Sequence, residues 1–529
     1  MQRIKIKDFI KKNLKNILAT MFLIAGLIYD MYLYISPGKW FVDSDMASEM
    51  MLAKKLNDEG GILSKTWYYS TELRVFCQQW FLRIGIYVYP GNWHRARLIG
   101  GFLMILVAVL SAYFFFKMAG CSKEGAMFGA GIMAWPFGRE YYFYAIWGLY
   151  YLSHIILAVI LVLMFLWCLK NFDAKDRKLK VLLCLIASFL CGLNGIRLVY
   201  STFIPLVLAC LIVVFLDKKK ESLNKWCISA AMMIFGILGW GYNGFVLVNN
   251  YHFNTFDNIA WKKEFSIKLE DLVRDYFCYY GYQSGAKLFS FLGIASCFGI
   301  LLAVLVFACS IRLLFIYKKL DYVQQLLVMF YHSALFVHLM MFYFIDHYCS
   351  QYFLTLIPFA VLMVIIEFET ENWNYRVTKD ILAVIVVLCV LVSSRASALG
   401  EQTQPKYAIH SQYAQQQAVE YLLDNGYTQG FGSFWQTNVL TELSNGQIEM
   451  WNIGWRLNGK DNIDILEWLQ STDHAKTLPK GKTFIFYNRV DDWGFDQCPL
   501  LKNGKKVFEN GYYSIFVYDS ADEIVKGLK

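Results

Sequence analysis

The chain has 529 residues, of which 57% are hydrophobic, 18% are aromatic and only 17% are charged, and its mean hydropathy is +0.38. Soluble domains usually carry about 25% charged residues, so the composition excludes a soluble protein and predicts an integral membrane protein. The formal net charge of +9 does not predict a nucleic-acid partner, because the basic residues gather in short connections between apolar runs.

Eleven apolar runs are predicted to cross the bilayer as helices, because every backbone amide in the bilayer core must be satisfied within its own segment. A membrane β-barrel is excluded, since its strands would alternate in polarity over about 10 residues. The first run has no cleavage site for a signal peptide and is expected to stay as an anchor. The predicted spans are 16–36, 97–116, 124–138, 151–169, 180–194, 198–216, 226–249, 288–317, 323–344, 350–367 and 380–399.

The short connections alternate in charge, which predicts their side of the membrane. The N-terminal tail and every second connection are rich in lysine and arginine, as in KNFDAKDRKLK and DKKKESLNK. The positive-inside rule places these segments in the cytoplasm. The protein is therefore expected in the cytoplasmic (cell) membrane with a cytoplasmic N-terminus and an extracytoplasmic C-terminal segment.

Three large segments are then expected outside the cell: 37–96, 250–287 and 400–529. Within the first, residues 46–58 and 71–88 are predicted to form two helices that lie in the membrane interface. So much structure on one face favours a protein that acts on a molecule at the outer surface of the membrane.

The last 130 residues contain fewer apolar runs and more polar residues, and they predict a small external α/β domain. Helices are predicted at 411–424 and 461–470, and strands at 447–453, 483–488 and 513–519. The predicted domains are thus a transmembrane module, 1–399, and an extracytoplasmic domain, 400–529.

An acidic motif, Asp43-Ser44-Asp45, follows the first span. One of the two carboxylates can cap the helix predicted to begin near Met46, which leaves the other for chemistry. It could take a proton from a substrate or, with its neighbour, hold a divalent cation such as Mg²⁺ or Mn²⁺. Two aspartates alone are too few ligands to decide the metal, so no cofactor is predicted with certainty.

Further polar residues, in the second interfacial helix of the first external segment or at predicted external ends of spans, are candidates for binding the substrate or its phosphate. Arginine can hold a phosphate through two hydrogen bonds, and a charge between two apolar runs is costly unless it has a partner. For the arginine between two such runs, Arg197, that partner is expected to be an acid of the first external loop or an anionic headgroup. Purely structural roles are the alternatives: a polar first helical turn for Glu72 and Arg74, an interfacial ion pair for Arg139 and Glu140, and a structural role for His347. The candidates are Glu72, Arg74, Arg139, Glu140, Arg197, His347, Tyr348 and Tyr352.

The pattern resembles the GT-C class of integral membrane glycosyltransferases. The resemblance rests on the many spans, on Asp43-Ser44-Asp45 early in the first external loop, and on HYCSQYFLTLIP at 347–358. It implies a multi-span module with an external C-terminal domain, and transfer of a sugar from a polyprenyl-phosphate carrier to a glycan, lipid or protein. It also implies that Asp43 or Asp45 is the catalytic carboxylate. His347 stands where many relatives carry arginine, so a phosphate-binding role does not carry over directly.

The chemistry suits these residues. A lipid-phosphate sugar has a good leaving group, so transfer needs a base for the acceptor hydroxyl and cations for the departing phosphate. A single displacement would invert the anomeric centre. The alternative functions are a lipid-linked sugar flippase or transporter, and an O-antigen polymerase or ligase.

Overall fold

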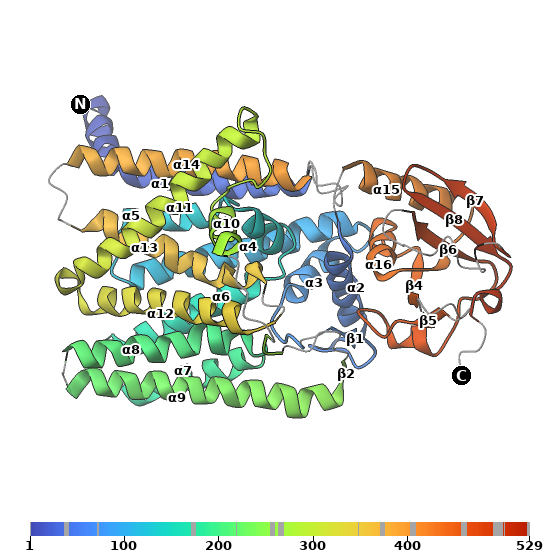
Figure 1. Cartoon of the computed structure of the whole chain (residues 1–529), viewed down its shortest axis with the longest axis horizontal. Helices are drawn as coiled ribbons and strands as arrows, with labels where there is room; N and C mark the ends of the chain where they lie inside the picture. The colour runs from blue at the N-terminus through green and yellow to red at the C-terminus, as the bar shows by residue number, and fades with distance from the viewer. Residues whose placement is uncertain are drawn as a thin grey trace. The chain divides into compact units, whose positions relative to one another are not determined.

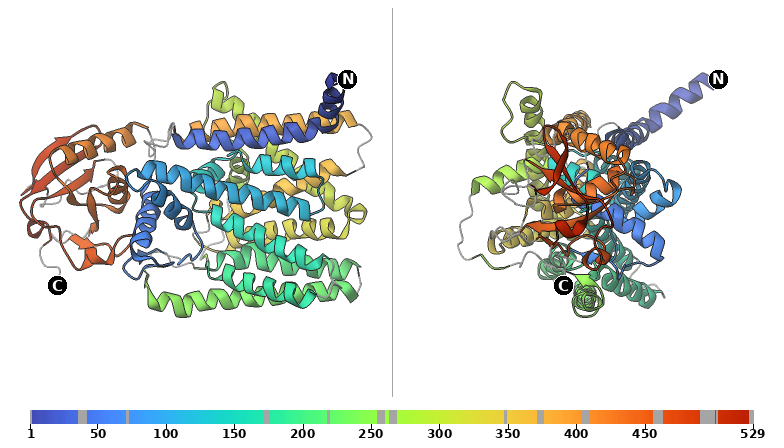
Figure 2. Two further views of the ribbon diagram at one scale, coloured as in Figure 1. Left: turned by 180° about the vertical axis from the view of Figure 1, so that it is seen from behind. Right: turned by 90° about the vertical axis from the view of Figure 1, so that its right-hand side faces the viewer.

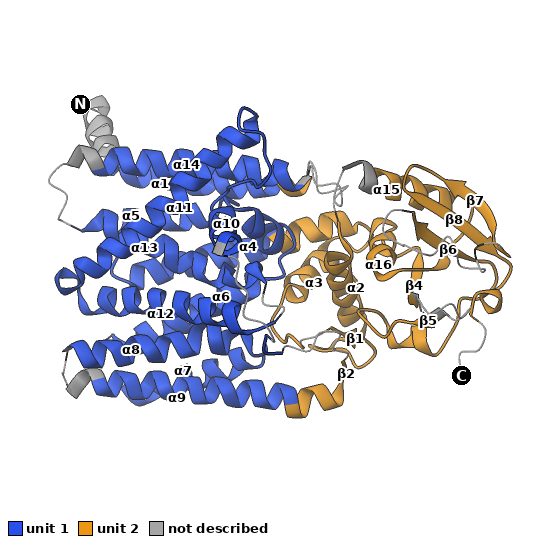
Figure 3. Cartoon of the chain, viewed as in Figure 1, with its two compact units in different colours: residues 1–32, 102–244, 259–401 blue, residues 33–101, 245–258, 402–529 orange. Residues whose placement is uncertain are grey.

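The structure is a computed structural model that describes residues 2–35, 42–70, 73–170, 176–217, 220–253, 260–262, 269–346, 349–370, 376–402, 409–455, 463–489, 501 and 503–525. The chain divides into two compact units (Figure 3). Unit 1 comprises residues 1–32, 102–244 and 259–401, and unit 2 comprises residues 33–101, 245–258 and 402–529. Each unit therefore combines segments that are far apart in the sequence.

Unit 1 is built from long apolar helices that run side by side (Figure 1) and keep this arrangement when seen from behind (Figure 2). In the described part of the chain, nine helical segments are long and apolar enough to cross a membrane. The predicted multi-pass helical membrane protein is confirmed. The nine segments are Asn13–Ile35, Trp93–Met118, Leu152–Leu169, Val199–Leu216, Leu223–Asn250, Phe291–Phe315, Tyr322–Phe344, Ser350–Glu369 and Lys379–Glu401.

These segments contain most of the longest helices of the chain. The helices are α1 (Gln2–Ile35), α4 (Trp93–Met118), α6 (Leu152–Leu169), α8 (Ile204–Asp217), α9 (Lys220–Tyr242), α11 (Phe291–Phe315), α12 (Tyr322–Phe344), α13 (Ile357–Glu369) and α14 (Arg376–Gln402). Shorter helical segments adjoin or connect them: η3 (Val199–Phe203), η4 (Asn243–Leu247), η5 (Val248–Asn250), α10 (Leu269–Tyr279), η6 (Tyr317–Lys319) and η7 (Ser350–Leu356).

Two of the predicted spans form helices that are too short for a full span. The run 124–138 forms α5 (Lys123–Met133), of 11 residues, and the π-helix η2 (Tyr141–Trp147) comes after it. The run 180–194 forms α7 (Arg177–Gly192), of 16 residues, which packs against α6 and α9. Both are shorter than the about 20 residues that a full span requires.

Unit 2 begins with the predicted helix of the first external segment, which is α2 (Ser44–Glu59). The second predicted helix is shorter than expected: α3 spans Gln79–Val88, because residues 75–77 form a bend. Between them β1 (Tyr68–Tyr69) pairs in parallel with β2 (His252–Phe253), which belongs to the second segment that was predicted to be external. α2 packs against α3 and against α16 (Phe434–Leu443) of the C-terminal segment.

The C-terminal segment forms a six-stranded mixed sheet in the order β5-β4-β3-β6-β8-β7. β3 pairs in parallel with β4 and β6, and the outer pairs are antiparallel. The predicted helix at 411–424 and the three predicted strands are confirmed. The elements are α15 (Ile409–Asp424), β3 (Gln429–Gly432), β4 (Glu449–Trp455), β5 (Ile463–Ile465), η9 (Thr472–Ala475), β6 (Thr483–Asn488), β7 (Lys505–Glu509), β8 (Tyr513–Tyr518) and η11 (Ala521–Glu523).

The sheet is apolar on both faces, as expected for parallel strands that are covered on both sides. On one face Phe484 and Phe486 of β6 pack with buried residues of α15 and α16. On the other face Ile485 and Tyr487 pack with Trp451 and with the C-terminal residues up to Val525. The predicted small α/β region is therefore present, whereas the predicted division of the chain at residue 400 stays a prediction.

The predicted helix at 461–470 is wrong. Residues Ile463–Ile465 form β5, which pairs antiparallel with β4 so that Ile465 lies opposite Ile453. Ile463 and Ile465 are two residues apart, and this period of two matches a strand. Pairing with β4 decides the local structure here.

Candidate functional site

The acidic motif lies at the start of α2 in unit 2. Asp43 is the N-cap residue, and its Oδ1 accepts a hydrogen bond from the backbone N–H of Met46 at 2.8 Å. Asp45 lies in the first turn, where the helix dipole favours a negative charge. Between them the buried Ser44 hydroxyl donates to the backbone oxygen of Phe434 in α16. Asp43 is thus the capping residue of α2.

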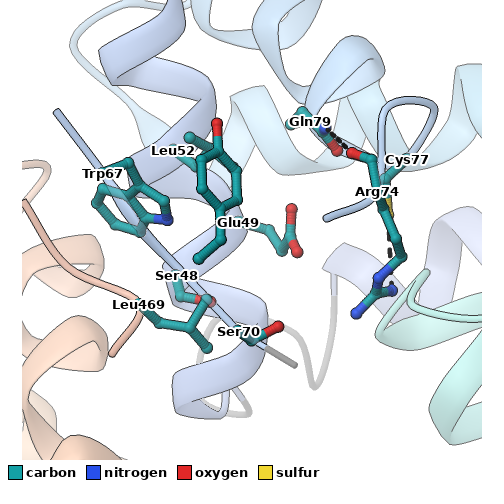
Figure 4. A pocket seen from close by; sticks show the side chains of 10 residues that line it. Ser48, Glu49, Leu52, Trp67, Ser70, Arg74, Cys77, Gln79 and Leu469 are labelled. Atoms are coloured by element: carbon teal, nitrogen blue, oxygen red, sulfur yellow. Dashed lines mark hydrogen bonds between the residues drawn. The ribbon is translucent and has the colours of Figure 1, made fainter. Parts of the chain in front are cut away.

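A pocket of unit 2 opens beside the next two turns of α2 (Figure 4). Its cavity volume is about 20 Å³, and it is lined by side chains from α2, from the segment around β1, from the bend before α3 and from residue 469. The lining residues are Ser48, Glu49, Leu52, Trp67, Tyr69, Ser70, Arg74, Cys77, Gln79 and Leu469.

Glu49 is the acidic group of this pocket. In the view of Figure 4 its carboxylate lies between Trp67 and Arg74. Burial raises the pKa of Glu49, although the charges of Arg74 and Arg97 act to lower it. A carboxyl group with a raised pKa facing a cavity is typical of functional sites. The sequence interpretation missed Glu49, and the one available signal was its position four residues after Asp45, on the same face of the helix.

Arg74 is the basic group of the same pocket. Its Nη1 lies 3.7 Å from Sγ of Cys77, and its backbone oxygen accepts from Nε2 of Gln79 at 3.3 Å. The side chain is half-buried. The structure therefore places the predicted Arg74 in a pocket with a carboxylate, while its predicted neighbour Glu72 lies outside the described residues.

A buried ion pair contacts the first turn of α2. Nε and Nη2 of Arg97 donate to the two carboxylate oxygens of Glu442 at 2.7 and 2.6 Å, and both side chains are less than 5% exposed. Nη2 also donates to the backbone oxygen of Met46 at 2.9 Å. This pair joins α4, α16 and the first turn of α2. Nothing in the sequence predicts it, because its members are 345 residues apart.

A second group of predicted residues lies in unit 1. Nε of Arg139 donates to the carboxylate of Glu401 at 2.5 Å, so its charge is already balanced. The adjacent Glu140 is partly buried, and its Oε2 has no hydrogen-bond partner among the described residues. Burial raises the pKa of Glu140, although Arg139 acts to lower it. The structural alternative of an interfacial ion pair therefore holds for Arg139, with Glu401 as its partner.

Arg197 is held between two aromatic rings of unit 1. Its guanidinium carbon lies 5.0 Å from the ring centre of Tyr151 and 4.6 Å from that of Tyr352. Such cation–π contacts offset part of the cost of a charge near the membrane. The structure therefore brings together Arg197 and Tyr352, two of the predicted residues. His347 and Tyr348, predicted in the same segment, lie outside the described residues.

Unit 1 also contains a large apolar groove between α10, α11, α12 and η7. Its cavity volume is about 350 Å³, and most of its lining is apolar, including Phe307, Leu339 and Phe353. Asp275 and Ser350 are its polar lining residues. This lining suits a hydrocarbon chain.

The described residues contain no group of three or more His, Cys, Asp or Glu side chains that could hold a metal ion. Mg²⁺ is often held by one or two carboxylates together with phosphate oxygens and water. Asp43 and Asp45 fit only that kind of ion, with the remaining ligands supplied by a substrate phosphate.

No protein-family profile and no curated protein matches the chain. Among solved structures it is similar to ArnT from Cupriavidus metallidurans, both in the apo state and bound to undecaprenyl phosphate. Each has a TM-score of 0.56 at 11% identity, covering 94% of this chain and 98% of that chain. The Archaeoglobus fulgidus oligosaccharyltransferase in complex with Zn and sulfate has a TM-score of 0.46 at 11% identity, covering 81% and 62%. The likeness to ArnT shows the fold, and the predicted GT-C fold is confirmed.

Proposed function

We propose that the protein is a membrane glycosyltransferase that transfers a hexose or pentose from a polyprenyl-phosphate donor to an extracytoplasmic glycan, lipid or protein. The observation that carries the proposal is the charged pocket of unit 2, where Glu49 and Arg74 line a cavity on the helix that Asp43 and Asp45 begin. ArnT, which has the same fold, has been solved with undecaprenyl phosphate bound.

The donor has an apolar tail and a charged head, and each unit by itself offers a suitable surface for one part. The apolar groove of unit 1 suits the polyprenyl chain. The carboxylates and Arg74 of unit 2 suit the reacting head. These assignments need no ATP or nucleotide sugar outside the cell.

In the proposed reaction an acceptor hydroxyl oxygen attacks the anomeric carbon of the donor sugar. The bond between that carbon and the phosphate oxygen breaks, and polyprenyl phosphate leaves with the electron pair. Asp43 or Asp45 takes the hydroxyl proton, and an arginine stabilises the charge on the phosphate. Arg74 is favoured for this role because it belongs to unit 2, like the acidic motif, and lines the pocket with Glu49. A single displacement of this kind inverts the anomeric centre.

The experiment uses the purified full chain in lipid nanodiscs with polyprenyl-phosphate-linked, radiolabelled mannose, glucose or arabinose, and a cell-envelope extract as acceptor. Asp43→Asn and Asp45→Asn are the informative variants, because asparagine caps a helix as well as aspartate does and only the charge is lost. Asp58→Asn on the exposed end of α2 is the matched control.

We expect label transfer by the wild type and by Asp58→Asn. We expect a loss of roughly 10²-fold or more, the usual contribution of a general base, in at least one of the two Asn variants. Full activity of both single variants and of the double variant would overturn the assignment of the base. Movement of the donor across the bilayer without transfer would favour the transporter alternative.

A further inference from the structure

The C-terminal segment contains a buried histidine whose two ring nitrogens both face oxygen atoms. His474 lies in η9 and is 3% exposed. Its Nδ1 lies 2.9 Å from Oε1 of Gln470, and its Nε2 lies 3.2 Å from Oε1 of Glu449 in β4. The ring also stacks on the indole of Trp451 in β4, with the ring centres 4.3 Å apart. The charge of this ring therefore depends on which of the two oxygens needs a hydrogen-bond donor.

The orientation of the Gln470 amide makes its oxygen an acceptor. Oε1 accepts from the backbone N–H of Asn452 at 2.9 Å, while Nε2 donates to the backbone oxygens of Asn452, at 3.2 Å, and of Leu466. A flipped amide would point its NH₂ group at an N–H and its oxygen at two carbonyls. Nδ1 of His474 must therefore carry a proton, which it donates to Oε1 of Gln470.

The oxygen on the other side of the ring belongs to a carboxylate. The hydrogen bond from His474 lowers the pKa of Glu449, although burial acts to raise it, so this group is ionised at neutral pH. An ionised carboxylate can only accept hydrogen bonds. The contact at Nε2 thus also needs a proton, and only the doubly protonated, positively charged ring satisfies both oxygens.

The other charged groups around this contact lie on α2 and η9. Lys55 of α2 acts to lower the pKa of Glu449, and it pairs with Glu59 at 3.6 Å and with Asp473 at 3.9 Å. Lysine and the carboxylates keep their charges between about pH 5 and pH 8, whereas histidine changes its charge in this range. The ion pair between His474 and Glu449 is therefore the contact in this group that responds to pH.

Gln470 connects this ring to the segment around β1. Residues 470–472 run antiparallel to residues 66–68. The backbone oxygen of Gln470 accepts from the N–H of Tyr68 at 2.9 Å, and a second backbone bond joins the other ends of the two stretches at 3.0 Å. Residues of or next to both stretches line the small pocket that contains Arg74. His474 thus acts, through Gln470, on the contact between the C-terminal segment and one wall of that pocket.

We propose that His474 is a pH-sensitive switch within unit 2: its protonated ring stabilises the contact between residues 470–472 and residues 66–68, and loss of the Nε2 proton weakens it. Without that proton the Nε2 lone pair faces the carboxylate of Glu449, and two acceptors repel each other. The Glu449 side chain is 53% exposed, so protons can pass between the ring and solvent. The inference goes beyond the proposed function and does not depend on it, because it concerns the stability of unit 2 and not the transfer.

The first test follows the protonation of the ring. Nitrogen-15 NMR of the full chain in nanodiscs, with labelled histidine rings, covers the range from about pH 5 to pH 8, and the signals of His474 are those lost in His474→Gln. We expect both ring nitrogens to be protonated at pH 5. As the pH rises, only Nε2 should lose its proton, because Nδ1 keeps its contact with Gln470. A ring that keeps one charge state over this range, or that loses the Nδ1 proton, would overturn the inference.

The second test measures how firmly the two stretches are joined. Hydrogen exchange with mass spectrometry on the full chain compares peptides that contain residues 66–68 and 470–472 in the wild type and in His474→Gln, at about pH 5 and pH 8. Glutamine keeps a neutral donor and acceptor but cannot titrate in this range. At pH 5 we expect these amides to exchange about tenfold faster in His474→Gln, the usual effect of losing one hydrogen bond to a charged group. At pH 8 the two proteins should differ little. An equal effect at both pH values would indicate a role in packing alone and would overturn the inference.

The matched control is His252→Gln, which replaces an exposed histidine of β2 in the same unit. Its ring centre lies 5.4 Å from that of Tyr68, and the variant should exchange like the wild type at both pH values. Glu449→Gln keeps the ring of His474 but removes the charge of its partner. It should speed exchange relative to the wild type at pH 5 and not at pH 8. Thermal unfolding identifies a variant that fails to fold, and Glu449→Gln carries the test if His474→Gln does.

Discussion

The ion pair between Arg97 and Glu442 connects the first turn of α2 to the C-terminal segment. Replacing Arg97 by methionine would leave Glu442 buried without its partner, because both side chains are less than 5% exposed. We expect Arg97→Met to lower the free energy of unfolding by about 3–5 kcal/mol, as for other broken buried pairs. Thermal unfolding of the full chain in detergent measures this.

Two control variants test this prediction. The double variant Arg97→Met/Glu442→Leu should recover much of the loss, because no charge is then left buried. Lys54→Met breaks the exposed pair with Asp58 and should cost less than about 1 kcal/mol. Equal effects of Arg97→Met and Lys54→Met would contradict a structural role for the buried pair.

Glu49 predicts a pH dependence of stability. Because its pKa in the folded protein is raised above the ordinary value of 4.5, the folded state binds the proton more tightly than the unfolded state. Its contribution to stability is therefore lost as the pH rises from about 4.5 through the raised pKa. Glu49→Gln removes this loss. The difference in stability between the variant and the wild type should therefore shift in favour of the variant between pH 5 and pH 8.

Glu59, at the C-terminal end of α2, predicts a pH dependence of stability in the opposite direction. Burial acts to raise its pKa, but hydrogen bonds from Thr66 and Ser64 lower it overall. Its stabilising contribution is present above pH 4.5 and is lost as the pH falls below that value, so relative to the wild type Glu59→Gln should be less stable at pH 5 than at about pH 3. Melting temperatures of Glu59→Gln at these two pH values, and of Glu49→Gln at pH 5 and pH 8, check this, and shifts of the same sign with rising pH would contradict it.

The acidic motif could be found from the sequence, whereas most of the pocket could not. Asp43 and Asp45 follow an apolar span, and this context made them candidates without a structure. From the sequence alone, Glu49 is one polar residue of a predicted amphipathic helix, and Trp67 resembles an ordinary core residue. Their meeting with Leu469, about 400 positions later, depends on packing between α2 and the C-terminal segment. No local pattern encodes that contact.

The helix α2 ends where its sequence predicts. Gly60 adopts φ of 80°, in the left-handed region, and its N–H donates to the backbone oxygen of Leu56 at 2.9 Å. A methyl group there would meet no other atom within 4 Å, so the cost of Gly60→Ala is backbone strain alone. We expect a loss of about 1 kcal/mol in the free energy of unfolding.

Gly91→Ala is the matched control for this prediction. A methyl group at Gly91 also meets no atom within 4 Å, and its backbone is not in the left-handed region. It should leave the melting temperature nearly unchanged. A similar loss in both variants would mean that the αL conformation at Gly60 does not determine the end of α2.

The elements of the sheet show why local patterns succeed at some places and fail at others. β6 and β8 are continuous apolar runs bounded by polar residues, and both were predicted within one residue. The segment 461–470 has apolar residues that fit either a helix or a strand. Its partner β4 selects the strand, because pairing in a sheet overrides weak local preference.

Hydropathy is sufficient to predict the polytopic helical fold of the whole molecule, because the bilayer imposes helices on every long apolar run. It predicts spans at 124–138 and 180–194, yet the helices there, α5 and α7, are shorter than a full span requires. It also gives no sign that residues 33–101 and 245–258 belong to one compact unit with the C-terminal segment. Such grouping depends on side-chain contacts between segments hundreds of residues apart.

The predicted orientation of the chain can be tested with reporter fusions. The basic connection after α8 is expected in the cytoplasm and the chain after α14 outside. A phosphatase that is active only outside the cytoplasm should therefore be inactive when fused after residue 217 and active when fused after residue 402. The reverse pattern would place the proposed site in the cytoplasm, where a lipid-linked donor on the outer leaflet is out of reach.

The central proposal, sugar transfer from a lipid phosphate, is tested most directly by following both products of one reaction. The purified chain in nanodiscs is supplied with a polyprenyl-phosphate sugar and envelope extract, and mass spectrometry quantifies free polyprenyl phosphate and glycosylated acceptor. We expect the two products to form in equal amounts with the wild type and neither to form with the Asp43→Asn/Asp45→Asn double variant. An unchanged donor in the wild-type reaction with every sugar tested, or equal turnover by the double variant, would contradict the account.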